Sequence, residues 1–212
     1  MTAVARSNSR AAPSVLVIAC GALAQEIMDL KRANDWHSMT VQCLPAELHN
    51  FPDRIPEAVR GKIRELRGDF DQVFVAYADC GTGGLLDAVL KEENVARIPG
   101  AHCYEFYAGS PLFEALSDAE PGTFYLTDFL TRNFDRLIWK GLGLDRHPHL
   151  ADEYFRNYTK LVYLAQVQDD DLVERARRAA DRLGLAFDHR VTGYGDLERA
   201  LVTLTGGGTW RS

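Results

Sequence analysis

The chain contains four cysteines, and each stands at or just past the end of an apolar run that is typical of a β-strand. These runs end at Cys20, Cys43, Cys80 and Cys103. In a parallel sheet the carboxyl ends of the strands share one edge, which is where α/β proteins bind ligands. Thiolates gathered there would bind a metal ion or act as nucleophiles. The alternative without chemistry is that four reduced cysteines pack in the interior.

The predicted metal ligands are Cys20, His49, Cys80 and Cys103, because His49 follows the second strand in a loop stiffened by prolines. Three thiolates and one imidazole suit the tetrahedral shell of Zn²⁺. No Cys-x-x-Cys pair occurs in the sequence, so it is not that of a zinc finger or ribbon. Ligands from separate strand ends are typical of catalytic metal sites. Three cysteines could instead hold an iron–sulfur cluster.

A glycine-rich loop follows the most strongly apolar strand, with the sequence Asp79-Cys80-Gly81-Thr82-Gly83-Gly84. Its glycines allow positive φ angles and a close approach to a ligand. Amides at the start of the following helix could bind an anion or stabilise the Cys80 thiolate. The spacing fits neither a P-loop nor a dinucleotide fingerprint. A tight strand-to-helix turn around a buried cysteine is the structural alternative.

Other candidates carry weaker signals. Glu26 could point along the edge that holds Cys20, and Asp79 could orient a ligand as a neighbouring carboxylate. Cys103 stands at a predicted helix start, which should lower the pKa of its thiol. The aromatic residues that follow it, Tyr104, Phe106 and Tyr107, are interpreted as helix packing.

Strand-like and helix-like segments alternate along the chain with short connections, which is typical of an α/β fold. The predicted strands cover residues 14–20, 39–43, 72–78, 95–98, 122–126, 160–165 and 186–191. The predicted helices cover residues 22–34, 53–67, 84–92, 102–116, 128–140, 149–157, 169–183 and 196–204. We therefore expect a mainly parallel, Rossmann-like sheet with helices on both faces.

Length and composition set the remaining expectations. The 212 residues fit a disordered tail at 1–12, an α/β domain at 13–205 and a flexible end at 206–212. A cluster of Gly, Pro and His near residues 142–149 could divide the domain into lobes 13–142 and 143–205. The net charge of −6 argues against a broad nucleic-acid surface. No apolar stretch suits a membrane helix, and we expect a cytoplasmic protein with reduced thiols.

Several motifs resemble a bacterial and archaeal domain family of unknown function, DUF1638. They are Ala19-Cys20-Gly, Leu48-His49, Tyr77-Ala-Asp-Cys80-Gly-Thr-Gly-Gly, and Cys103-Tyr-Glu-Phe-Tyr-Ala-Gly109-Ser110. The resemblance spans roughly residues 14–190 and implies that Cys20, His49, Cys80 and Cys103 form the shared set, with Cys43 left as a packing residue. An aspartate is common at the position of His102, which weakens His102 as a ligand. Members are often encoded beside corrinoid-dependent methyltransferases, which implies one-carbon metabolism.

The leading hypothesis is a zinc–thiolate enzyme, or a component of one, in methyl transfer. The methyl carrier would be a corrinoid or tetrahydrofolate bound at the loop of Gly81, Thr82, Gly83 and Gly84, and the acting residues would be Cys80, Asp79 and Glu26. We expect a small-molecule substrate and a corrinoid protein or methyltransferase as partner. The alternatives are an iron–sulfur protein, a non-enzymatic adaptor or metallochaperone, and a metal-free thiol enzyme in which His49 or His102 is the base for Cys80.

Overall fold

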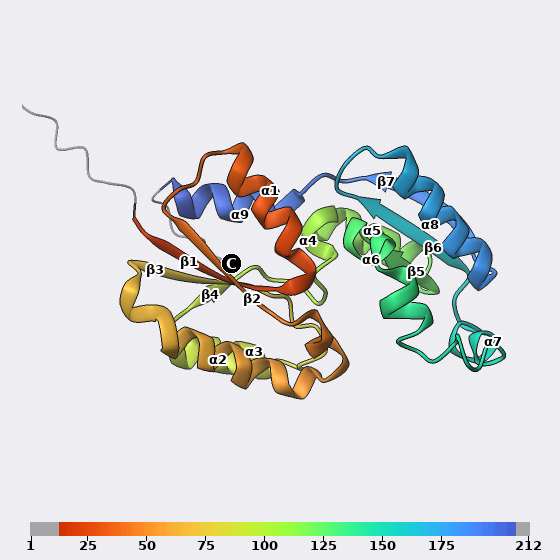
Figure 1. Ribbon diagram of the computed structural model, residues 1–212, viewed down its shortest axis with the longest axis horizontal. Helices are drawn as coiled ribbons and strands as arrows, with labels where there is room; N and C mark the ends of the chain where they lie inside the picture. The colour runs from red at the N-terminus through yellow and green to blue at the C-terminus, as the bar shows by residue number, and fades with distance from the viewer. Residues whose placement is uncertain (1–12, 207–212) are drawn as a thin grey trace, which may run out of the picture.

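The computed structural model describes residues 13–206, in which two all-parallel sheets are flanked by helices (Figure 1). This confirms the predicted α/β class with a Rossmann-like arrangement. The predicted tail at residues 1–12, and residues 207–212 of the predicted flexible end, lie outside the described part. Between residues 13 and 206, no helix combines the length and apolar character needed to cross a membrane.

The first sheet has the strand order β2-β1-β3-β4. Its strands are β1 (Val15–Cys20), β2 (Met39–Leu44), β3 (Gln72–Ala76) and β4 (Ala96–Arg97). All residues of β1 are apolar and buried, as expected for a central strand covered on both faces. Figure 1 shows α1 (Ala24–Ala33) and α9 (Gly195–Thr205) on one face, and α2 (Ile55–Leu66) and α3 (Leu85–Glu93) on the other. We call this sheet with these helices the first unit.

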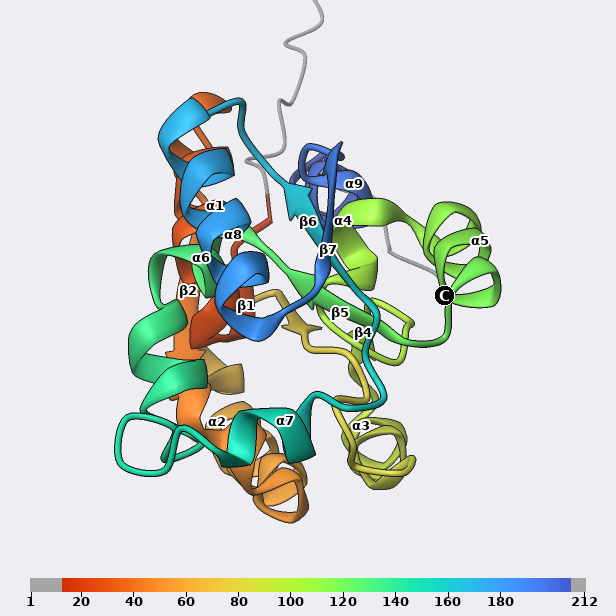
Figure 2. The ribbon, with the colours of Figure 1, turned by 90° about the vertical axis from the view of Figure 1, so that its right-hand side faces the viewer.

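The second sheet has the order β5-β6-β7, with β5 (Thr123–Leu126), β6 (Lys160–Ala165) and β7 (Ala186–Val191). Figure 2 shows β6 between its two neighbours, with α8 (Asp170–Leu183) across the sheet. Alternate residues of β6 face opposite sides, because side chains in a strand have a period of two. Leu161 and Tyr163 pack with the core under α8, whereas Val162 and Leu164 pack beneath Tyr104 and Phe113.

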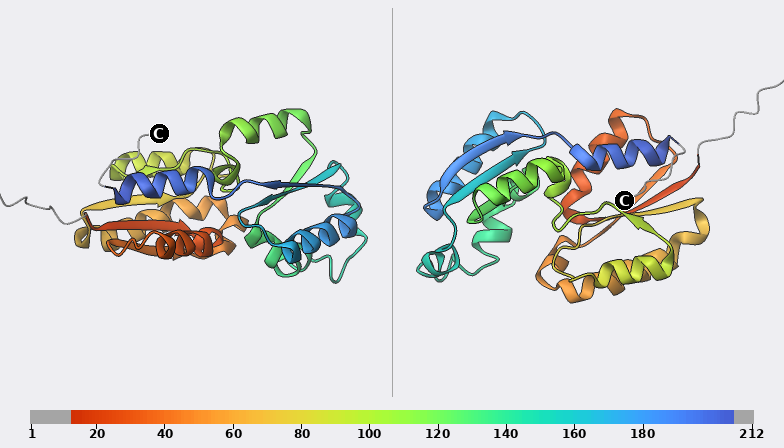
Figure 3. Two further views of the ribbon diagram at one scale, coloured as in Figure 1. Left: turned by 90° about the horizontal axis from the view of Figure 1, so that it is seen from above. Right: turned by 180° about the vertical axis from the view of Figure 1, so that it is seen from behind.

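Shorter helices complete the second unit, which we define as β5–β7 with α5 (Ser110–Ala119), α6 (Asp128–Arg132), α7 (Leu150–Tyr154) and α8. A four-residue helix, α4 (Glu105–Ala108), lies where the two units meet and buries Phe106 and Tyr107 in the core of the first unit. After β7 the chain returns to the first unit as α9 (Figure 3). The two units lie side by side along the long axis of the molecule.

Two predicted helices are interrupted in the structure. The helix predicted at residues 102–116 is broken into α4 and α5 at Gly109, whose φ of +73° is a conformation that favours glycine. The helix predicted at 128–140 ends at Arg132 and resumes as a π-helical turn at Asp135–Trp139. The change of sheet falls between β4 and β5, whereas the predicted lobe boundary at 142–149 lies between β5 and β6.

Candidate metal centre

Cys20 is the last residue of β1 and is fully buried. The chain continues as a 3₁₀ turn, Gly21–Leu23, whose first amides have no acceptor within the turn itself. The Cys20 thiol provides an acceptor for the Ala22 amide at 3.4 Å. A side chain at Gly21 would come to 3.0 Å from the Leu44 carbonyl oxygen of β2, which is closer than ordinary van der Waals contact, so glycine lets the chain pass close to β2 here. These contacts fix Cys20 at the predicted edge of the sheet.

Cys80 lies just beyond β3, in a left-handed conformation with φ of +49° that non-glycine residues rarely adopt. The Asp79 amide donates to the Gly100 carbonyl at 3.0 Å, and the Cys80 amide donates to the Ala101 carbonyl at 2.9 Å. These bonds extend the pairing of β3 with the segment after β4. They bring the Cys80 sulfur to 3.3 Å from the Cys103 sulfur.

Cys103 is buried in the turn that precedes α4, so it does not open a long helix as predicted. Its carbonyl accepts a hydrogen bond from the Phe106 amide at 3.2 Å. The expected lowering of its pKa is wrong. The hydrogen bond with Cys80 and, next, burial hold the pKa of the Cys103 thiol well above its ordinary value. The neighbouring His102 is exposed and stacks on the Tyr104 ring, with the two centroids 4.8 Å apart.

His49 comes from a 3₁₀ segment, Ala46–Asn50, that directly follows β2. The residue is exposed, but its Nδ1 atom faces inward and lies 3.6 Å from the Cys20 sulfur. Its imidazole therefore forms part of the outer wall around the buried thiols.

The mutual distances suit a tetrahedral metal ion. Bond lengths of 2.0–2.3 Å to zinc separate a nitrogen and a sulfur ligand by about 3.6 Å, and two sulfur ligands by about 3.8 Å. One ligand atom each from His49, Cys80 and Cys103 lies within 4.8 Å of the others. Cys20 is not a member of this group and joins it through the contact of its sulfur with His49. The structure thus brings three of the four predicted ligands around one point and puts the fourth beside them.

The charges within the cluster favour deprotonation of Cys80. The hydrogen bond from Cys103 and the adjacent His49 lower the pKa of the Cys80 thiol to about 5, against the opposing effect of burial. Hydrogen bonds with Cys20 and Cys80 raise the pKa of His49 to about 10. Without metal, the pair is therefore a thiolate and an imidazolium at neutral pH. A metal ion would replace the proton that His49 carries.

The glycine loop satisfies its own amides. The Asp79 carboxylate accepts from the Thr82 hydroxyl at 2.6 Å, from the Gly84 amide at 2.8 Å and from the Gly83 amide at 3.1 Å. Burial raises the pKa of Asp79, but these donors outweigh it and lower the pKa overall. Asp79 therefore holds the loop in shape. The amides predicted to meet a cofactor anion at Gly83 and Gly84 already have an acceptor here.

Glu26 lies in α1 and is buried, with 2% of its surface exposed. It faces the second unit and does not belong to the thiol group. Its Oε1 atom lies 3.9 Å from Nη1 of Arg132 in α6. Burial raises the pKa of Glu26 to about 7, helped by the nearby negative charge of Asp128.

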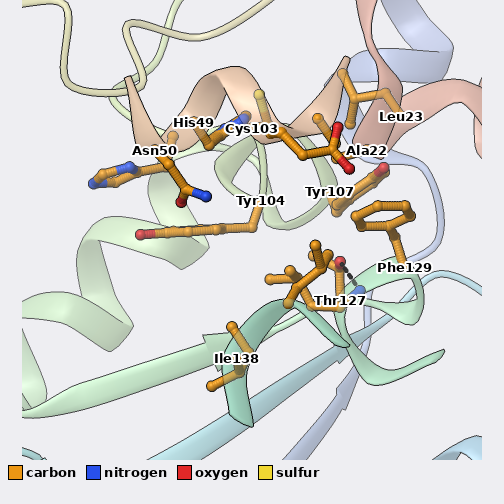
Figure 4. Close-up of a pocket in the computed structure, with 15 residues that line it drawn as sticks. Ala22, Leu23, His49, Asn50, Cys103, Tyr104, Tyr107, Thr127, Phe129 and Ile138 are labelled. Carbon is orange, nitrogen blue, oxygen red and sulfur yellow. Dashed lines mark hydrogen bonds between the residues drawn. The ribbon is translucent and has the colours of Figure 1, made fainter. Parts of the chain in front are cut away.

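A cavity of about 200 Å³ opens beside the thiols, between the carboxyl edges of the two sheets (Figure 4). His49, Cys103 and Leu23 line it from the first unit. Thr127 and Phe129, which directly follow β5, line it from the second unit. The remaining lining residues are Ala22, Ala46, Glu47, Asn50, His102, Tyr104, Tyr107, Leu130, Leu137 and Ile138. The wall is thus mainly apolar and aromatic, with polar groups gathered near the thiols.

Two interpretations from the sequence need correction. Cys43 is exposed on β2, although it was expected to pack in the interior. Tyr107 does pack under its helix, but it also lines the cavity, and sequence reasoning missed this second role. The wall formed by Phe129 and Ile138 was missed as well. The only sequence signal for it was an apolar segment directly after a predicted strand.

Comparison with known proteins gives a family but no activity. No curated protein and no solved structure matches the chain. The family model described as "Protein of unknown function (DUF1638)" matches residues 43–201. The match includes His49, Cys80 and Cys103 and begins after Cys20. Because it covers most of the chain, this protein belongs to the DUF1638 family.

Proposed function

We propose that the chain is a zinc–thiolate protein that binds a small thiol or a related soft nucleophile and activates it for methyl transfer. The observation that supports this most is the group of His49, Cys80 and Cys103, whose ligand atoms lie within 4.8 Å of one another at the wall of a cavity. Catalytic zinc sites have three protein ligands and keep a fourth position for water or substrate.

Cys20 is the ligand that could leave this position open. It contacts His49 and is held by the Ala22 amide, but it is not in the group of mutually close ligand atoms. In the proposed site Cys20 orients the His49 ring, and an incoming thiol takes the fourth position. Zinc would lower the pKa of that thiol, so that the sulfur gives up its proton and becomes the nucleophile.

The cavity constrains where the methyl donor could lie. A volume of about 200 Å³ is below the range of roughly 300–1,000 Å³ that is typical of pockets for drug-sized ligands. The cavity therefore suits a small acceptor and is too small to enclose a corrinoid or a folate. In the proposed reaction, a partner protein brings the methylated carrier to the mouth of the cavity. The carrier keeps both electrons of the broken bond, and the methyl group goes to the thiolate.

Metal analysis of anaerobically purified protein tests the proposal. We expect about one zinc per chain, and expect Cys80→Ser and Cys103→Ser each to lose most of it. Cys43→Ser is the matched control, because Cys43 is exposed and lies outside the group. It should keep its zinc. Unchanged zinc in a Cys80→Ser/Cys103→Ser double variant would contradict the proposal, and iron with sulfide would favour the iron–sulfur alternative.

A second candidate function is that of a metal-free thiol enzyme. The charge pairing of Cys80 with His49 and the Cys103 sulfur at 3.3 Å favour it, because such a thiolate is a ready nucleophile. In this case the purified protein would contain no stoichiometric metal. An electrophilic substrate analogue would label Cys80, and labelling would need His49 but not Cys20.

A further inference from the structure

The sulfur atoms of Cys80 and Cys103 are in direct contact in the folded protein. They lie 3.3 Å apart, although the two residues are 23 positions apart in the sequence. Two sulfur ligands of a tetrahedral zinc ion are about 3.8 Å apart, and the sulfurs of a disulfide are roughly 2.0 Å apart. The observed distance lies between these values. The pair is therefore placed for either of two states, one bridged by a metal ion and one bonded directly.

Hydrogen bonds hold the backbone on both sides of this contact. The Cys80 amide donates to the Ala101 carbonyl at 2.9 Å, and the Ala101 amide donates to the Glu105 carboxylate at 2.9 Å. Glu105 is itself buried and accepts a second hydrogen bond from the Ser110 hydroxyl at 3.0 Å. Ala101 thus ties the turn that contains Cys103 to the strand end that carries Cys80. To form a disulfide, the two sulfurs need to approach by only about 1.3 Å.

The other two cysteines are placed differently. Cys43 is exposed on β2, and Cys20 is fully buried at the end of β1. Between residues 13 and 206, the contact of Cys80 with Cys103 is the one sulfur–sulfur contact within hydrogen-bonding range. Oxidation governed by exposure would start at Cys43, whereas oxidation governed by this contact would pair Cys80 with Cys103. The two cases give different products.

Cys103 gives small reagents a route to the pair, because it lines the cavity (Figure 4). We propose that Cys80 and Cys103 close a reversible disulfide when a peroxide enters this cavity. The peroxide oxidises one thiol to a sulfenic acid and is itself reduced, which releases one water molecule. The second sulfur then attacks the sulfenic sulfur, forms the S–S bond and displaces a second water molecule. The two thiols together lose two electrons, which the peroxide takes up.

The disulfide would control the proposed metal site. This consequence deepens the proposed function and rests on it, whereas the disulfide itself does not. A metal ion is bound by thiolates, and the sulfurs of a disulfide no longer carry that charge. Of the three mutually close ligands, closing the disulfide removes Cys80 and Cys103 and leaves only His49. Oxidation would therefore release the zinc ion and stop the binding of substrate thiols.

The same cavity allows the reverse reaction. A small thiol that enters it meets the Cys103 sulfur in the wall. Attack there forms a mixed disulfide, and the Cys80 sulfur leaves as a thiolate. A second small thiol then attacks the mixed disulfide, which frees Cys103 and releases a small-molecule disulfide. Molecules of the class proposed as methyl acceptors would thus return the site to its metal-binding state.

Thiol counting and mass spectrometry on metal-free protein test the disulfide. The folded protein is treated with limiting hydrogen peroxide and then alkylated in urea. We expect two of its four thiols to remain, with one cross-linked peptide pair that joins Cys80 to Cys103. Treatment with 2-mercaptoethanol should restore all four thiols. Cys43→Ser is the matched control and should form the same disulfide, because Cys43 is exposed and lies outside the group.

Zinc-loaded protein tests the link to the metal, with a chromogenic zinc indicator present during oxidation. We expect about one zinc ion released for each disulfide formed. If the disulfide forms and the zinc stays bound, the control of the metal site is overturned. If the metal-free protein forms the disulfide but the purified protein contains no zinc, the proposed function fails and the redox pair stands.

The redox pair itself is overturned by the metal-free protein alone, whatever its zinc content after purification. Peroxide could leave all four thiols free, or oxidise Cys80 or Cys103 to a sulfinic acid without any disulfide. It could also join either residue to Cys20 or Cys43 in the folded protein. Each of these results would show that the contact between the two sulfurs does not direct the oxidation.

Discussion

Cys80 combines three properties that rarely occur together in one residue. Its backbone adopts a strained left-handed conformation, its thiol is buried, and its pKa is nevertheless lowered to about 5. Strained residues persist where surrounding structure holds them, and they are concentrated at functional sites. Here the hydrogen bonds from the Asp79 and Cys80 amides to the segment after β4 hold the backbone in this strained conformation. The energetic cost of this strained backbone is consistent with a role in holding the Cys80 sulfur beside Cys103 and His49.

The charge state of Cys80 gives a prediction for metal-free protein. Alkylation by iodoacetamide requires the thiolate, so its rate at Cys80 should stay flat from pH 8 down to about pH 6 and fall as the pH nears 5. His49→Ala should move this fall to higher pH, because it removes the adjacent positive charge. Mass spectrometry identifies the labelled residue. A rate that already falls below pH 8, as for an ordinary thiol, would contradict the proposed ion pair.

At the scale of elements, the loop between β3 and α3 takes its shape from a side chain. Asp79 accepts hydrogen bonds from one hydroxyl and two amides, which fixes a turn rich in positive φ angles. We therefore expect Asp79→Ala to lower the free energy of unfolding by about 1–3 kcal/mol. It should also weaken zinc binding, because Cys80 lies at the start of this loop. Urea denaturation and a competitive zinc chelator measure the two effects.

The matched control for this loop variant is Asp53→Ala, since Asp53 is exposed in the 3₁₀ turn Pro52–Arg54 before α2. It should change neither the stability nor the zinc affinity. Equal effects of the two substitutions would show that Asp79 does not shape the site. Loss of stability with unchanged zinc affinity would show that Cys80 reaches its place without Asp79.

The sequence predicted the elements well where a local pattern determines them. The apolar run of β1 and the cysteines at strand ends were enough to place Cys20 and Cys80 at one edge, because parallel strands share that edge. Local patterns did not predict that the Asp79 carboxylate would accept hydrogen bonds from the amides of its own loop. They also did not predict the break at Gly109, because glycine in a helical pattern does not reveal the sign of its φ angle.

The cavity and the surroundings of Glu26 depend on contacts between distant segments. Leu23, Cys103 and Phe129 meet only after both sheets have formed and packed together. Glu26 likewise meets Arg132 across the junction between the units. A single sequence contains no local pattern for such pairs, so the partners of Glu26 across the junction were missed.

At the scale of the whole molecule, burial of Glu26 between the units links stability to pH. Its pKa of about 7 exceeds its ordinary value of 4.5, so the folded protein retains a proton that the unfolded chain has released. Its contribution to stability is therefore fully present below about pH 4.5 and is lost as the pH rises through 7. Glu26→Gln cannot ionise and avoids this loss. It should match the wild-type protein near pH 4.5 and gain up to about 3 kcal/mol at pH 8.

Urea denaturation of the two proteins across this pH range measures the difference. Glu57→Gln is a suitable control, because Glu57 is exposed on α2, away from the junction. Its stability should follow that of the wild-type protein at every pH. A gain for Glu26→Gln that does not change with pH would mean that packing, and not ionisation, explains it.

The return of α9 to the first unit means that the second unit is joined to the first by two lengths of chain, one after β4 and one before α9. A body with two tethers can swing about the line between them but cannot twist freely. Any widening of the cavity would then be a hinge rotation of the second unit away from the first. His49, Cys80 and Cys103 all belong to the first unit, while Phe129 and Ile138 belong to the second. A rotation of this kind would admit a substrate without moving the three proposed metal ligands relative to one another.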